Sequence, residues 1–177
     1  MFLGQMMDKP LVLLDIDNTL AFVNQSWLCR APSFTFRLAG ECYHCYIRPG
    51  VFTFVAWLLQ HYRVGVWTAA ERQYAACVLR RIFGLRWRHC VHCFFHRRHC
   101  TVSRAGDYIK DLRRLDEWLP EVPSNVLLID DNPIHARFNM RHASLSQRRV
   151  LACNAYYGHH HDVEFARLQR LITVVCV

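Results

Sequence analysis

The chain has 177 residues, 53% of them apolar and 20% charged, which suits a single packed domain over 1–177 and excludes a disordered or low-complexity protein. No apolar run reaches the roughly 18 residues of a membrane-spanning helix, because Asp15 and Asp17 interrupt the longest candidate. The amino terminus lacks the pattern of a secretory signal, so we expect an intracellular protein, nuclear or cytoplasmic, without a membrane partner.

The charge of the chain is unbalanced. Its 22 basic residues exceed its 14 acidic residues, giving a formal net charge of +8, and all but Lys9 and Lys110 are arginines. No acidic residue occurs between Glu71 and Asp107, where arginines are interspersed with aromatic residues. Guanidinium groups bind phosphate through paired hydrogen bonds, so this arginine-rich stretch suits a phosphorylated protein or a nucleic acid. A solvated basic face without a partner explains the composition equally well.

The first part of the chain alternates between strand patterns and one helical pattern. Residues 11–14 form a continuous apolar run, which is typical of a buried strand. The alternating segments 33–38 and 42–47 predict a β-hairpin. A helix is expected over 51–62 and a second buried strand over 64–67.

The second part continues this alternation. Helices are predicted over 71–83, which a glycine follows, and over 107–119, which a proline follows. Apolar runs predict strands over 126–129 and 150–153. A last helix is expected over 162–173, capped by the aspartate at its start.

Strands that alternate with helices predict an α/β fold. We expect a central parallel sheet flanked by helices, as in a Rossmann-like core. A small antiparallel hairpin, over about 20–47, would be inserted after the first strand. The insert is too short to form a large cap domain.

Acidic residues follow two of the predicted strands. Asp15 and Asp17 come after the first strand, and Asp130 and Asp131 come after the strand over 126–129. The carboxyl ends of parallel strands meet at one edge, so these carboxylates would repel one another there. Mg²⁺ is the simplest neutralising ion, because it prefers hard oxygen ligands. Taken singly, each motif is also an ordinary turn or helix cap.

Two further polar residues extend this pattern. Thr68 follows the strand over 64–67, and Lys110 is the only lysine beyond the first ten residues. The order Asp-x-Asp-x-Thr, Thr, Lys and Asp-Asp resembles the haloacid dehalogenase-like phosphohydrolases. Over about residues 11–171 the chain is more specifically similar to the RNA polymerase II C-terminal-domain phosphatases and their small relatives. The blocks that carry this similarity are Ile47-Arg48-Pro49-Gly50, Val66-Trp67-Thr68-Ala69, Tyr108-Ile109-Lys110-Asp111-Leu112 and Leu128-Ile129-Asp130-Asp131-Asn132-Pro133.

The resemblance implies roles for four of these residues in catalysis. Asp15 would be the nucleophile that forms an aspartyl-phosphate. Asp17 would be the general acid for the leaving oxygen and later the base for water. Thr68 and Lys110 would bind the phosphate oxygens and stabilise the charge of the transferring group.

The resemblance also implies a magnesium site. The ion would be held by a carboxylate oxygen of Asp15, the backbone carbonyl of Asp17 and the side chain of Asp131. Asp130 would orient the metal-bound waters or add a ligand. Mg²⁺ is therefore the expected cofactor.

Without a large cap, the site would stay open to a phosphorylated protein segment, plausibly the C-terminal repeat of RNA polymerase II. In the small phosphatases that the chain resembles, an apolar pocket beside the insert holds a proline near the phosphoserine. Tyr74 stands where such a pocket residue is expected, with Phe22 or Trp27 as its partner. Arg97, or its neighbour Arg98, stands near the position of a substrate-contacting arginine. Core packing is the alternative role for the three aromatic residues.

Cysteines and histidines are dense in segment 89–100, which departs from the family pattern. Cys90 and Cys93, with Cys42 and Cys45, form two CxxC pairs that could bind Zn²⁺. However, 44 residues separate the pairs, and a regular strand over 42–47 would point Cys42 and Cys45 to opposite faces. Buried thiols that act as small apolar residues are the alternative, which we favour.

The sequence favours a Mg²⁺-dependent phosphatase of phosphoserine or phosphothreonine in a protein. A phosphatase of nucleic-acid ends is an alternative that shares the Asp-x-Asp-x-Thr chemistry and would use the arginine-rich stretch. A zinc-stabilised module that binds phosphorylated or nucleic-acid partners without catalysis is the other alternative.

Overall fold

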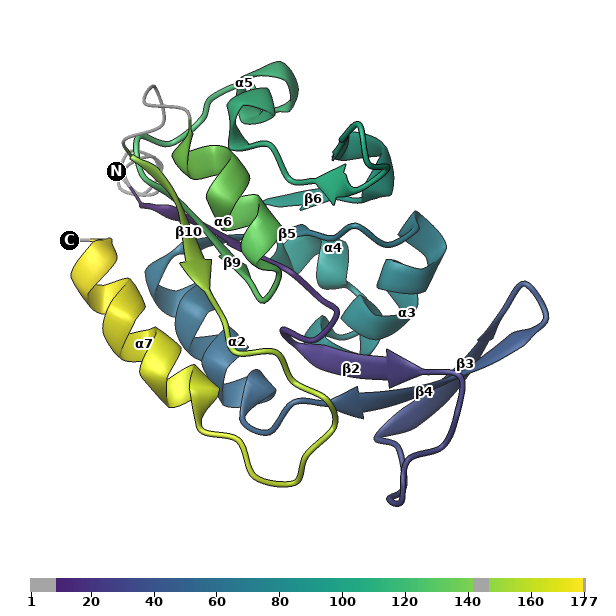
Figure 1. Cartoon of the computed structure of the whole chain (residues 1–177). Helices are drawn as coiled ribbons and strands as arrows, with labels where there is room; N and C mark the ends of the chain where they lie inside the picture. Colours follow the sequence, from purple (N-terminus) through teal and green to yellow (C-terminus); the bar gives the residue numbers. More distant parts are fainter. Residues whose placement is uncertain (1–8, 142–146, 177) are drawn as a thin grey trace.

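A five-stranded parallel sheet forms the centre of the fold in the computed structural model, which describes residues 9–141 and 147–176 (Figure 1). The strand order is β10-β9-β1-β5-β6, and every neighbouring pair runs parallel. The predicted parallel sheet is therefore confirmed. Its strands are β1 (Leu11–Leu14), β5 (Arg63–Trp67), β6 (Cys93–Phe95), β9 (Val126–Asp130) and β10 (Arg148–Ala152).

Helices cover both faces of the sheet because both faces are apolar. Leu11 and Leu13 of β1 point to one face, where α5 (Leu115–Trp118) packs. Val12 and Leu14 point to the opposite face. Three helices pack there, namely α2 (Val51–His61), α3 (Arg72–Phe83) and α7 (Glu164–Val175). No helix in the described parts of the chain is long and apolar enough to cross a bilayer.

A second, antiparallel sheet is inserted between β1 and α2 and projects beyond the central sheet (Figure 1). It contains β2 (Ala21–Asn24), β3 (Phe34–Leu38) and β4 (Glu41–Ile47), in the order β2-β4-β3. The hairpin predicted over 33–38 and 42–47 is confirmed as β3 and β4, with Phe36 opposite Tyr43. We did not expect β2, because its four residues are too few to show an alternating pattern.

The helix predicted over 107–119 is wrong. The chain there forms three short elements, β8 (Tyr108–Ile109), η2 (Leu112–Arg114) and α5. Ile109 and Leu112 are buried three residues apart, a spacing that imitates one face of a helix. The turn begins at Asp111, whose side chain accepts a hydrogen bond from the backbone N–H of Arg113 at 3.1 Å. Lys110 therefore lies between a strand and a turn.

The remaining predicted elements are present, with shifts at their ends. The helices over 51–62 and 71–83 correspond to α2 and α3, and the strand over 150–153 corresponds to β10. The last helix begins at Glu164, whose backbone N–H donates to Oδ1 of Asp162 at 2.9 Å. The elements not predicted, besides β2 and β6, are α4 (Trp87–Cys90), η1 (Arg97–His99), β7 (Thr101–Val102) and α6 (Pro133–Met140).

A buried arginine ties the insert to the chain that follows β10. The guanidinium of Arg48 donates to the carbonyl oxygens of Thr19 and Asn154, at 3.1 and 2.8 Å. It also donates to Oδ2 of Asp162 at 2.9 Å. A buried charge needs such partners, because they replace the water that it has lost. Arg48 thus fixes the loop after β1 against the loop after β10, and both loops border the candidate site.

Gly65 in β5 leaves no room for a side chain. A Cβ there would lie 2.4 Å from Sγ of Cys93 and 2.6 Å from Cδ2 of Leu13. We expect Gly65→Ala to lower the free energy of unfolding by about 1–3 kcal/mol, because overpacking strains a core. Urea denaturation would measure the change.

The double variant Gly65→Ala/Cys93→Ala is the control for this explanation. Cys93→Ala removes one of the two clashing atoms, so the double variant should lose less stability than the sum of the single variants. Additive losses would contradict the steric account.

Candidate active site

Carboxylates converge at the carboxyl edge of the parallel sheet. β1 pairs with β9 in a register that sets Leu14 beside Ile129, so Asp15 and Asp130 follow side by side. Asp15, Asp130 and Asp131 each offer an oxygen, and these oxygens lie within 4.8 Å of one another. In residues 9–141 and 147–176, no other cluster of three or more acidic, histidine or cysteine side chains meets this criterion. The donor set consists of hard oxygens, which suits Mg²⁺.

Lys110 lies between two of these carboxylates. Its Nζ donates to Oδ1 of Asp15 and, at 2.6 Å, to Oδ2 of Asp130. Burial acts to lower the pKa of Lys110, but the attraction of Asp130 and Asp15 outweighs it and raises that pKa. Burial raises the pKa of Asp15 to about 6, against the attraction of Lys110. Lys110 thus supplies the positive charge that the buried carboxylates need.

Asp17 lies in the turn that follows β1, near the carboxylate cluster. Burial and the charge of Asp15 raise the pKa of Asp17 to about 6. Its Oδ1 accepts a hydrogen bond from the hydroxyl of Tyr74 at 2.5 Å. The turn continues through Asn18, which has a left-handed φ of 58° that asparagine adopts more readily than most residues. Asp17 is therefore held from α3 as well as by its own turn.

Thr68 follows β5 at the same edge of the sheet and is fully buried. Its backbone N–H donates to the carbonyl of Phe95 at 3.1 Å, and its hydroxyl oxygen accepts from the backbone N–H of Ala70 at 3.0 Å. Thr68 thus shapes the loop that leads into α3. Its neighbour Ala69, rather than Thr68 itself, lines the cavity beside the carboxylate cluster.

The carboxylate cluster borders a cavity of about 350 Å³, which we name the catalytic cavity after the roles predicted for its residues. It contains Asp15, Asp17, Lys110, Asp130 and Asp131, so five of the six predicted catalytic and metal residues border one space. The other residues that line it are Asn18, Ala69, Asn132, Pro133, His135, Ala155 and Tyr157.

The sequence analysis missed His135 and Tyr157, which belong to no motif that we identified. Nδ1 of His135 accepts a hydrogen bond from the backbone N–H of Lys110 at 3.3 Å, and its Nε2 lies 3.7 Å from Oδ2 of Asp130. Burial, with the nearby charge of Lys110, lowers the pKa of His135 to about 3. His135 is therefore neutral, with its proton on Nε2, and it braces the backbone of Lys110.

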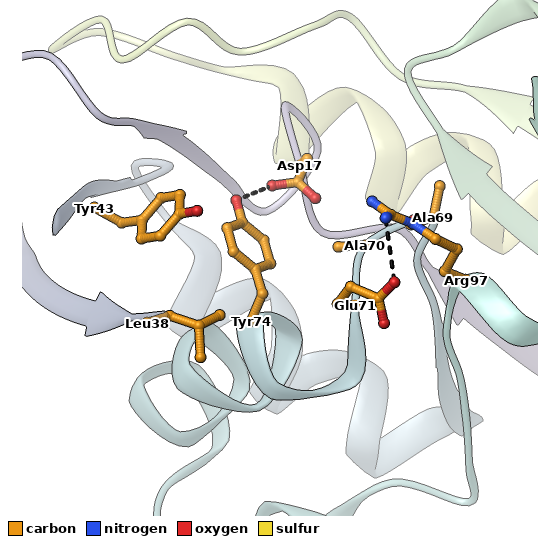
Figure 2. A pocket seen from close by; sticks show the side chains of 8 residues that line it. All are labelled: Asp17, Leu38, Tyr43, Ala69, Ala70, Glu71, Tyr74 and Arg97. Atoms are coloured by element: carbon orange, nitrogen blue, oxygen red, sulfur yellow. Dashed lines mark hydrogen bonds and ion pairs between the residues drawn. The ribbon is translucent and has the colours of Figure 1, made fainter. Parts of the chain in front are cut away.

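A second cavity, of about 530 Å³, shares Asp17 with the first (Figure 2). Tyr74 from α3 and Tyr43 and Leu38 from the insert form its apolar side. Arg97 lines the same cavity; it donates to the carbonyl of Ala69 at 2.9 Å and forms an ion pair with Glu71. Two of the predicted substrate residues, Tyr74 and Arg97, therefore border one pocket beside the catalytic cavity.

The predicted partners of Tyr74 lie elsewhere, which corrects our expectation. Phe22 packs against Tyr157, with ring centroids 6.0 Å apart, and Trp27 packs against His44. The insert residues beside Tyr74 are instead Tyr43 and Phe36, with ring centroids 5.6 and 5.7 Å away, and of these Tyr43 lines the pocket. Tyr43 was missed because the strand pattern alone did not show which of its aromatic residues faces α3.

The structure does not bring the four candidate zinc ligands together. Cys45 is buried in the core, whereas Cys42 lies at an odd spacing from it on β4 and so points to the other face of the insert. Sγ of Cys93 packs beneath Gly65 in the central sheet, and Cys90 is exposed on α4. No metal-binding group in the described ranges includes any of these thiols. The geometry therefore does not support the zinc site that these cysteines offered as an alternative.

Comparisons with known proteins agree with this geometry. The model of the family described as NLI interacting factor-like phosphatase matches residues 10–175. A CTD phosphatase-like protein of Invertebrate iridescent virus 3 is 30% identical over 140 residues, which cover 70% of this chain and 75% of that protein. The predicted resemblance to the C-terminal-domain phosphatases is thereby confirmed.

Solved structures support the fold. The fission yeast RNA polymerase II CTD phosphatase Fcp1, bound to beryllium fluoride, superposes with a TM-score of 0.59 at 16% identity. Another structure of Fcp1, described as an essential RNA polymerase II CTD phosphatase, gives a TM-score of 0.60 at 18% identity. The matches cover 98% and 97% of this chain but 52% and 50% of those chains, so this chain spans about half their length.

The position of Lys110 predicts a large effect on stability. Lys110→Met would leave the buried carboxylates of Asp15 and Asp130 without their cation. We expect the free energy of unfolding to fall by about 3–5 kcal/mol, since breaking a buried ion pair strands a charge. Urea denaturation in the presence of EDTA would measure this loss.

The matched control is Lys110→Met/Asp130→Asn, which removes one of the two stranded charges as well. It should recover much of the lost stability. A single variant as stable as the wild type would show that Lys110 does not neutralise the cluster.

Proposed function

The chain belongs to the NLI interacting factor-like phosphatase family, and we propose that it hydrolyses phosphoserine or phosphothreonine in a protein segment with the help of Mg²⁺. The observation that carries this proposal is the shared cavity of Asp15, Asp17, Lys110 and Asp131. The cavity combines a nucleophile, an acid, a cation and metal ligands at one edge of the sheet.

The reaction would proceed in two steps. A carboxylate oxygen of Asp15 attacks phosphorus and forms an acyl-phosphate bond, while the bond from phosphorus to the serine oxygen breaks. Asp17 gives its proton to that leaving oxygen. Asp17 then takes a proton from water as the water attacks phosphorus, which releases phosphate and restores Asp15. The raised pKa of Asp17, about 6, suits a group that must both give and accept a proton near neutral pH.

The carboxylate cluster fits a divalent ion. Asp15 and Asp131, with Asp130 as a ligand or an orienting group, would hold Mg²⁺ through oxygens that already lie close together. When bound, Mg²⁺ would offset the negative charge of the phosphate and of the carboxylates. Lys110 would then be free to turn toward a phosphate oxygen. Thr68 would support the loop on which the phosphate rests.

The second cavity supports a protein segment as substrate. Leu38, Tyr43 and Tyr74 would receive an apolar side chain, such as proline, next to the phosphorylated residue. Arg97 on the opposite side of the cavity would contact the backbone or a polar group of the segment (Figure 2). A phosphorylated repeat like that of the RNA polymerase II C-terminal domain has this chemistry, and we propose it as the substrate class.

A phosphatase of nucleic-acid ends is the second candidate. Arg80, Arg81, Arg86 and Arg88 are exposed on and near α3 and α4, where they could contact a phosphodiester backbone. None of these four arginines lines the catalytic cavity. The protein substrate is therefore the better supported candidate.

The proposed chemistry predicts that Asp15→Asn abolishes activity. We expect the hydrolysis of an aryl phosphate to fall by a factor of roughly 10³ or more, because an amide cannot form the acyl-phosphate. Wild-type activity should require Mg²⁺ and be lost in EDTA. Acid quenching followed by mass spectrometry should locate a phosphate on Asp15 in the wild type.

Asp116→Asn is the control variant, since Asp116 is an exposed carboxylate paired with Arg148 outside both cavities. It should retain wild-type rates. Full activity in Asp15→Asn would rule out this mechanism.

The proposed substrate class is tested by a panel of phosphates. Phosphoserine peptides with proline beside the phosphoserine should exceed matched alanine peptides in kcat/KM by roughly tenfold, the effect of burying one apolar side chain. Tyr43→Ala should remove this preference. Faster turnover of a 3′-phosphorylated oligonucleotide than of any peptide would favour the second candidate instead.

A further inference from the structure

Tyr74 connects the two cavities through its hydrogen bond to Asp17. Tyr74 lines the apolar pocket, and its hydroxyl donates to Oδ1 of Asp17, which lines both the pocket and the catalytic cavity. Figure 2 shows the phenol reaching from α3 to the carboxylate. The proposed general acid is therefore in direct contact with the wall of the substrate pocket.

Tyr74 is held in place by aromatic side chains of the insert. Its ring makes edge-to-face contacts with Phe36 and Tyr43 of the insert, with centroids 5.7 and 5.6 Å away. Burial raises the pKa of Tyr74, with the nearby charge of Asp17 acting in the same direction, so the phenol keeps its proton. The neutral phenol can therefore donate to Asp17, as it does here to Oδ1.

A hydrogen bond donated to one carboxyl oxygen favours the form that carries the acidic proton on the other oxygen. A protonated carboxyl group has one oxygen that carries the proton and one that accepts hydrogen bonds. Because the phenol donates to Oδ1, the favoured form of protonated Asp17 carries its proton on Oδ2. The same contact limits rotation of the carboxyl group.

We propose that Tyr74 is a positioning residue for Asp17, which holds Oδ1 so that Oδ2 carries the proton for the leaving oxygen. As the bond from phosphorus to the serine oxygen breaks, the proton moves from Oδ2 to that oxygen and leaves Asp17 as a carboxylate. A substrate side chain that packs against the ring of Tyr74 is thereby linked to proton transfer in the next cavity. This inference rests on the proposed role of Asp17 as general acid.

The test distinguishes a residue that positions Asp17 from one that only lines the substrate pocket. Tyr74→Phe keeps the ring and removes only the hydroxyl. The value of kcat/KM should be measured for a series of aryl phosphates with leaving groups of increasing pKa, because this constant reports the steps up to transfer to Asp15. The most acidic phenols leave without a proton, so their rates should stay within about twofold of wild type. For the least acidic phenols we expect a loss of roughly tenfold or more.

Two controls accompany this series. Tyr62→Phe removes a phenol at the end of α2, outside both cavities, and should keep the wild-type dependence on the leaving group. In an Asp17→Asn background, Tyr74→Phe should cause no further loss, since the group that it positions has gone.

Several results would overturn the inference. They are an equal loss for all leaving groups, a change in KM alone, or additive losses with Asp17→Asn. A crystal structure in which the hydroxyl of Tyr74 does not contact Asp17 would also overturn it, whatever the activity. Failure of phosphopeptides as substrates would reject only the proposed substrate class, because the aryl phosphate series tests Tyr74 without them.

Discussion

The attraction between Lys110 and the carboxylates of Asp15 and Asp130 is the interaction on which the candidate active site depends. Parallel strands direct their carboxyl ends to one place, and here two of those ends carry buried negative charges. The backbone of Lys110 is clamped from α6, since His135 accepts its N–H and the side-chain amide of Asn139 donates to its carbonyl at 2.9 Å. The lysine is therefore fixed at both its backbone and its ammonium group.

The fold could be predicted where local pattern and tertiary environment agree. The apolar runs 11–14 and 126–129 are strands because both faces of the sheet are covered, which is what a continuous run signals. The prediction over 107–119 failed because its apolar spacing is compatible with a helix, whereas Asp111 begins a turn there. β6 escaped notice because it pairs through only three residues. Short elements of this kind are determined by their neighbours in the sheet.

Some residues of the candidate site could likewise be predicted from the sequence and others could not. Asp15, Asp17 and Asp131 could be placed from the sequence, because strand ends in a parallel sheet lie together, whereas Lys110 could be placed only through the family resemblance. Tyr43, His135 and Tyr157 could not, since each reaches its cavity through the packing of one element on another. The CxxC pairs form no common site, because Cys42 and Cys45 occupy opposite faces of β4, as their spacing predicted, and Cys45 is a core residue.

The contact between Tyr74 and Asp17, at the place where the two cavities meet, has a consequence for inhibition. Phosphate mimics must carry negative charge to occupy the cavity of Asp15, and such charge hinders passage through membranes. A neutral, apolar compound between Tyr43 and Tyr74 would instead press on the phenol that contacts Asp17. Such a compound would act on the proposed proton donor without competing for the proposed metal ligands, so uncharged inhibitors could be designed against this pocket.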